Sequence, residues 1–83
     1  MKFRVEQSIE LRGDVIVFVR KLDESDFVLS ENPRLAGVGV RRQLSQPRAL
    51  TADGTPDLTV FAFHLVAAGD RSRLTIGQIV ELT

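Results

Sequence analysis

The N-terminal segment, residues 2–12, constrains the fold more than any other part of the sequence because its apolar and polar side chains alternate. The apolar positions are Phe3, Val5, Ile9 and Leu11, and Gln7 interrupts them. A period of two places successive side chains on opposite faces of a pleated strand. One apolar and one polar face is typical of an antiparallel sheet that covers a core with one side. We therefore predict a strand whose apolar side chains all lie in the core.

A second strand is predicted at residues 15–19, whose sequence VIVFV consists of β-branched and aromatic residues. If its valines face the core, Ile16 and Phe18 lie on the outer side of the sheet. Contiguous exposed apolar area on a folded protein indicates an interface. We therefore treat Ile16 and Phe18 as candidate binding residues, covered by the loop at residues 45–57, by a second subunit or by a partner protein.

The tripeptide Arg12-Gly13-Asp14 joins the two segments and has the sequence of an adhesion motif found in some extracellular proteins. A glycine at the first central position of a two-residue hairpin turn supplies the positive φ that such a turn requires. The chain has no cysteine, and its first residues, MKFRVEQ, lack the apolar core of a secretory signal. We therefore interpret Gly13-Asp14 as a hairpin turn and expect a cytoplasmic protein.

Shorter strands are predicted in the rest of the chain, where turn signals separate apolar runs. We expect them at residues 27–30, 34–44, 57–68 and 73–83. In the second of these, Ala36, Val38 and Val40 share one face, and in the last, Gly77 shifts the apolar phase by a bulge or a turn. The long loop at residues 45–57 is predicted to contain a helical turn near residues 48–52.

Together these segments predict an all-β chain, because none of them has the period of an amphipathic helix. Short strands with frequent turns are typical of a sandwich or a small barrel. Gly37 and Gly39 suit a strand that bends around a tight barrel. We predict a single domain, residues 1–83, folded as a small closed antiparallel β-barrel of about six strands.

The charges balance but are segregated along the chain. Lys and Arg number 11 and Asp and Glu number 11, and a net charge of zero disfavours nucleic-acid binding through many phosphates. Residues 23–31 carry only acids, whereas residues 34–48 carry only Arg34, Arg41, Arg42 and Arg48. Guanidinium groups suit phosphate and carboxylate, so Arg41 and Arg42 are candidates for an anion or an acidic partner. On a strand they would point to opposite faces. The alternative is that the two blocks pair with each other at the surface.

His64 is the only histidine, and no arrangement of a nucleophile with a base is apparent beside it. We expect a strand residue that is partly exposed, or a pH-sensitive contact on a binding surface. One histidine with scattered carboxylates does not predict a metal site. We therefore predict no enzyme activity, no metal and no cofactor. The sequence also has no apolar run long enough to cross a membrane.

The order of these segments resembles the second domain of translational GTPases such as elongation factor Tu, a six-stranded β-barrel. In that family an alternating strand led by phenylalanine precedes a glycine turn and a valine-rich strand, as in FRVEQSIELRG and DVIVFVRKL. The closing strand of the family contains glycine, glutamine and apolar residues, as in Gly77-Gln78-Ile79-Val80. The resemblance implies a closed barrel with a docking role. It does not imply GTP hydrolysis, because the chain has no phosphate-binding loop.

The function predicted from these features is a non-enzymatic binding module that contacts another protein or a second copy of itself. Its candidate binding residues are Ile16, Phe18, Arg41, Arg42 and His64. The alternative is a barrel associated with RNA or a ribonucleoprotein, as the resemblance to translation factor domains suggests.

Overall fold

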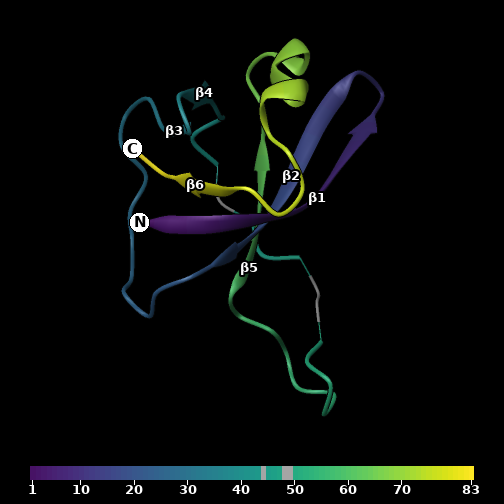
Figure 1. Ribbon diagram of the computed structural model, residues 1–83, viewed down its shortest axis with the longest axis vertical. Coiled ribbons are helices and arrows are strands. Elements are labelled where there is room, and N and C mark those ends of the chain that lie inside the picture. The colour runs from purple at the N-terminus through teal and green to yellow at the C-terminus, as the bar shows by residue number, and fades with distance from the viewer. Residues whose placement is uncertain (44, 48–49) are drawn as a thin grey trace.

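The computed structural model describes residues 1–43, 45–47 and 50–83, and its regular elements are mostly strands. The largest element is an antiparallel sheet in the order β5-β2-β1-β6, which curls into half a barrel (Figure 1). Its strands are β1 (Lys2–Leu11), β2 (Asp14–Lys21), β5 (Val60–His64) and β6 (Ile79–Glu81). A small hairpin pairs β3 (Arg34–Leu35) with β4 (Val38–Gly39). The all-β prediction is confirmed.

One short helix interrupts this pattern. It is the 3₁₀ segment η1 (Ala68–Arg73), which follows β5 and lies near the tip of the β1–β2 hairpin in Figure 1. None of the described helical residues forms a helix that could cross a membrane.

The core lies against the inner face of the four-stranded sheet. Val15, Val17 and Val19 of β2 are at most 1% exposed, as predicted from their alternation. Aromatic rings beside them fill the interior and meet edge to face at centroid distances of 5.2–6.2 Å; these are Phe3, Phe27, Phe61 and Phe63. Such pairs are stabilising beyond the area that they bury.

The turn between β1 and β2 is a two-residue hairpin turn, but its residues differ from the predicted ones. Arg12 and Gly13 have φ angles of 53° and 84°, which is the pattern of a type I′ turn. Asp14 pairs with Leu11 and already belongs to β2. The predicted Gly13-Asp14 turn is therefore wrong by one residue, because both central positions need a positive φ in this turn type.

The predicted core face of β1 is correct only as far as Val5. The register with β2 shifts between Val5 and Gln7, where Glu6 forms a β-bulge. A bulge adds one residue and reverses the side-chain phase beyond it. Ile9 therefore lies opposite Ile16 on the outer face, and Leu11 is 59% exposed. The prediction that both residues are in the core is wrong.

Two further predicted strands differ in the structure. Residues 27–30 form no strand, and Phe27 instead packs its ring against Phe3. The predicted single strand at residues 34–44 folds back on itself, because Ala36 and Gly37 form a second turn with φ angles of 50° and 79°. Ala36 is exposed in this turn and does not share the buried face of Val38.

The predicted strands at residues 57–68 and 73–83 are shorter in the structure. Of residues 57–68 only β5 is a strand, and of residues 73–83 only β6 is, because Gly77 forms a turn with a φ of 87° before β6 begins. Ser45 still bridges Ala62 of β5, and residues 50–57 extend away from the sheet as a long arm (Figure 1). Of its predicted helical turn, residues 48 and 49 lie outside the described residues, and residues 50–52 are not helical.

Single β-bridges, formed mostly by residues just outside the strands, connect the two sheets. Leu35 of β3 bridges Leu82, and Val40, next to β4, bridges Leu65, next to β5. Backbone hydrogen bonds continue both contacts: the amide of Thr83 donates to the carbonyl of Arg34 (2.9 Å) and the amide of Val66 donates to that of Gly39 (3.0 Å).

Candidate binding surface on the outer face of the sheet

The outer face of the sheet, on the side away from the core, brings several of the predicted site residues into one row. Cα pairing places His64 of β5 opposite Ile16 of β2, and Ile16 opposite Ile9 of β1. The amide of Arg41 donates to the carbonyl of His64 at 2.8 Å, next to the buried Val40–Leu65 bridge. Side chains alternate between the two faces of an extended chain and Val40 is buried, so Arg41 lies on the outer face beside His64. We call Arg41, His64, Ile16 and Ile9 the outer row.

Phe18 lies one pair further along the same face. It is opposite Ala62 of β5 on one side and Gln7 of β1 on the other. Ile16 and Phe18 are both half-buried, so neighbouring side chains cover only part of each. Side chains that face each other across adjacent strands lie about 5 Å apart, so these residues form one continuous surface.

His64 is half-buried, and its Nδ1 atom is buried without a hydrogen-bond partner among the described residues. The rest of the ring is the part that a partner could contact. No group of His, Asp and Glu side chains in the described ranges is placed to hold a metal ion.

At the end of the outer face away from the hairpin turn lies a charged network, which the sequence analysis did not identify. Arg20 of β2 donates from Nε to Glu6 (2.7 Å) and from Nη1 to Asp57 (2.7 Å) and Thr59 (2.9 Å). Arg4 also donates to Glu6, at 3.0 Å. The network fastens the base of the 45–57 loop to the bulge in β1.

These contacts change the proton affinities of the network. Hydrogen bonds from Thr59 and Arg20 lower the pKa of Asp57 to about 2. Hydrogen bonds from Arg20 and Arg4 also lower the pKa of Glu6, and hydrogen bonds to Asp57 and Glu6 raise the pKa of Arg20. Carboxylates that accept hydrogen bonds from cations and hydroxyl groups favour the ionised form, so the network is fully charged near neutral pH.

The hairpin end of the outer face also carries a charged pair. Arg41 donates to Asp14 at 3.1 Å, and about half of each side chain is exposed. Exposed pairs of this kind contribute little to stability. The apolar centre formed by Ile9, Ile16 and Phe18 thus lies between two charged groups of residues.

Helix η1 covers the part of the β1 edge that β6 does not reach. Arg71 donates to the Ser8 side chain (3.1 Å) and to the Ser8 carbonyl (3.2 Å), and its guanidinium lies 3.7 Å from Glu10. Side chains that cover a strand edge hinder the addition of a foreign strand. The outer face is therefore a better candidate surface than this edge.

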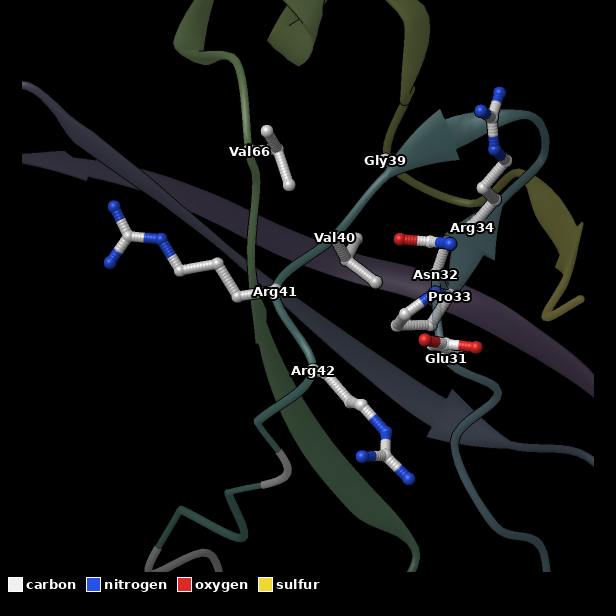
Figure 2. Close-up of a pocket in the computed structure, with 9 residues that line it drawn as sticks. All are labelled: Glu31, Asn32, Pro33, Arg34, Gly39, Val40, Arg41, Arg42 and Val66. Carbon is white, nitrogen blue, oxygen red and sulfur yellow. The ribbon is translucent and has the colours of Figure 1, made fainter.

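Arg42 is separated from the outer row. Figure 2 shows the guanidinium groups of Arg34, Arg41 and Arg42 pointing in different directions around a pocket of about 410 Å³. The divergence of Arg41 and Arg42 is as predicted for neighbours in an extended chain. Arg48, the fourth arginine of the basic block, lies outside the described residues.

The predicted pairing between the acidic and basic blocks is not found in the described residues. Among the described residues, no ion pair joins residues 23–31 to residues 34–47, and Arg41 pairs instead with Asp14 of β2. Arg34 and Arg42 make no ion pair within the described part of the chain.

Comparison with protein-family models, with curated proteins and with solved structures finds no match for this chain. The surface is therefore interpreted from its own geometry.

Proposed function

We propose that this chain is a non-enzymatic binding module that contacts another protein through the outer face of β1, β2 and β5. The observation that carries the proposal is the apolar centre of this face, formed by Ile9, Ile16 and Phe18, between two groups of charged residues. An apolar centre with a polar rim is the usual anatomy of a protein–protein interface. Aromatic side chains in such centres often contribute most of the binding free energy.

We also propose that the two sheets form one closed barrel, like the second domain of translational GTPases. The bridges from Leu35 to Leu82 and from Val40 to Leu65 support closure in the order β1-β2-β5-β4-β3-β6. Closure removes the free edges of a sheet. A closed barrel would bind through a face or a pocket, which agrees with the position of the outer row.

Photo-crosslinking tests the proposed surface. The photoreactive residue p-benzoylphenylalanine replaces Phe18 in one variant and Ile76 in the other. Ile76 is the matched control because it is a 65% exposed apolar residue in the turn before β6. In cells that produce the protein at its normal level, we expect a specific crosslinked protein from position 18 and none from position 76. Equal crosslinking at both positions, or none at position 18, contradicts the proposal.

Binding to RNA is the second candidate, because Arg34 and Arg42 carry charges that no acidic group among the described residues neutralises. It predicts binding of single-stranded RNA at low salt, weakened when Arg34 and Arg42 are replaced by Ala. Fluorescence anisotropy with a labelled RNA measures this. An unchanged signal up to millimolar protein excludes the RNA candidate.

A further inference from the structure

The pocket of about 410 Å³ in Figure 2 lies over the β3–β4 hairpin and is separate from the apolar centre around Phe18. It is lined by Gly39 of β4, by the neighbouring Val40 and by the exposed Val66, which follows β5 by two residues. None of the apolar residues at the centre of the outer face lines it. We call it the arginine pocket, because three arginines are on its rim.

Gly39 leaves the arginine pocket open, although neither its backbone nor its packing requires a glycine. Its φ lies outside the left-handed region that favours glycine. A Cβ atom added at this position would meet the side chain of Val66 at 3.7 Å, which is an ordinary van der Waals contact. Glycine in a strand costs stability, and it often marks a site where a ligand or another backbone approaches closely. The missing side chain therefore points to an occupant from outside the chain.

The rim of the arginine pocket carries more positive than negative charge. Its charged residues are Arg34, Arg41, Arg42 and Glu31. Arg41 is already paired with Asp14, at 3.1 Å. Arg34 and Arg42 are exposed, and neither is in an ion pair within the described part of the chain. Guanidinium groups without a partner favour an anionic ligand at these two positions.

The arrangement of the rim favours the carboxylates of an extended peptide over a small anion or a nucleic acid. The guanidinium groups of Arg34 and Arg42 point in different directions, so two separate anionic groups suit them better than one (Figure 2). No aromatic side chain lines the pocket, whereas proteins that bind single-stranded RNA commonly stack its bases on aromatic rings. In an extended peptide every second side chain lies on the same face. Two acidic side chains on either side of a small one therefore match two arginines on either side of a glycine.

We propose that the arginine pocket binds an extended acidic peptide segment of another protein. One carboxylate of the segment contacts Arg34 and another contacts Arg42. A small apolar side chain between them packs over Gly39 and against Val66. Glu31 on the same rim disfavours a further carboxylate beside it. The site is distinct from the outer face of the sheet, so it stands or fails independently of the surface proposed above.

Nuclear magnetic resonance titration of the whole chain tests the proposal. The probe is the peptide Glu-Ser-Ala-Ser-Glu with blocked ends, and its uncharged counterpart is Gln-Ser-Ala-Ser-Gln. We expect the acidic peptide to shift the amide signals of Gly39 and Val40 and the Nε–H signals of Arg34 and Arg42. The uncharged peptide should shift none of them. Arg34→Gln with Arg42→Gln removes both ion pairs, which should weaken binding about fivefold.

Two further sets of variants separate the charge of the pocket from its shape. Lys2→Gln with Lys21→Gln removes the same net charge at residues that do not line the pocket. At about 0.1 M salt it should change the affinity less than about twofold, because distant charges are screened. Gly39→Ala and Gly39→Val keep every charge and fill the hollow in two steps. We expect the affinity to fall at each step while the Tm does not fall, because a Cβ atom has room beside Val66.

Four results would overturn the proposal. The first is that the acidic peptide shifts no signal of the pocket. The second is that the lysine variant weakens binding as much as the arginine variant, since the attraction is then not localised. The third is that Gly39→Val binds as the wild type does, or that Gly39→Ala lowers the Tm, since the glycine then serves packing. The fourth is that hexauridylate RNA binds the pocket more tightly than the acidic peptide, since the occupant is then a nucleic acid.

Discussion

The two faces of β2 differ in a way that its composition alone does not explain. Its inner side chains are valines with no measurable exposure or almost none, whereas its outer side chains are the larger Ile16 and Phe18, which remain half-buried. Large apolar side chains usually occupy the better-buried positions. Here the better-buried face carries the smaller side chains.

Packing explains the inner face. The interior is occupied by the edge-to-face rings of Phe3, Phe61 and Phe63, so little space is left for side chains larger than valine on β2. Protein interiors are close-packed, and extra volume is costly. Ile16 and Phe18 lie outside this core, on the outer face, where Phe18 is opposite the buried Ala62 and both side chains are only partly buried. The core therefore determines the size of the side chains on the inner face of β2. The large apolar side chains on the outer face need another reason, which we propose is binding.

The largest expected effect comes from the inner face. Val17→Ser removes a buried side chain and leaves a hydroxyl group in the core, which should lower the free energy of unfolding by about 3 kcal/mol. A domain of this size has few kcal/mol to lose, so we expect a variant that is mostly unfolded at 37 °C. Urea denaturation followed by circular dichroism measures the loss. A change below about 1 kcal/mol would show that Val17 is not part of the core.

Phe18→Ser, on the outer face, should have a smaller effect on stability. Half-burial of a phenylalanine contributes about 1 kcal/mol, which is the expected loss. The same variant should remove the contact with the partner, so binding should be lost while the stability of the fold falls only slightly. Denaturation and sedimentation on the same samples test this. If Phe18→Ser instead unfolds the protein as Val17→Ser does, the two faces of β2 are equivalent and the proposed surface is wrong.

The strand alternation predicts β2 correctly and β1 only in part. Apolar alternation from Phe3 to Leu11 continues in sequence, but the bulge at Glu6 reverses it in space. The interruption at Gln7 is the one sign of this in the sequence, and it is also compatible with a regular strand. A bulge depends on what the extra residue contacts, here the side chains of Arg20 and Arg4, and those residues become neighbours only after folding.

The sequence predicts individual residues of the candidate site, but not that they lie together on one surface. Ile16, Phe18 and His64 follow from their phase on two strands. That Arg41 joins them depends on a backbone contact between two chain segments far apart in sequence. The Arg20 network was not predictable for the same reason, because Glu6, Arg20 and Asp57 come from distant segments.

Acidification should weaken the charged boundary of the outer face while leaving its apolar centre intact. The folded protein holds the pKa of Asp57 at about 2, below its ordinary value of 3.8. The ionised form therefore stabilises the fold above about pH 4, and this contribution is lost as the pH falls towards 2. Asp57→Asn removes it at every pH. We expect wild type to have a higher Tm than Asp57→Asn at pH 6, and the difference to shrink towards zero at pH 2.

Thermal unfolding at several pH values measures this difference. Glu6 also has a lowered pKa and shares Arg20 with Asp57, so Glu6→Gln is measured alone and together with Asp57→Asn to separate the two contributions. A difference in Tm that stays constant between pH 6 and pH 2 would show that Asp57 acts through its shape and hydrogen bonds rather than through its charge.

The smallest expected effect concerns the turn that joins β1 to β2. Arg12 adopts a left-handed φ of 53°, which asparagine tolerates better than arginine, and asparagine followed by glycine is the preferred sequence of a type I′ turn. Arg12→Asn should therefore raise the free energy of unfolding by about 0.5 kcal/mol and the Tm by about 3 °C.

Ala36→Asn in the β3–β4 turn, where φ is 50°, is the matched variant and should act in the same direction. Gly13→Ala should have the opposite effect, of about 1 kcal/mol, because its φ is 84°. Neither asparagine variant touches the outer row, so both should bind a partner as the wild type does. A loss of stability in Arg12→Asn would mean that Arg12 is retained for a contact of its own rather than tolerated in the turn.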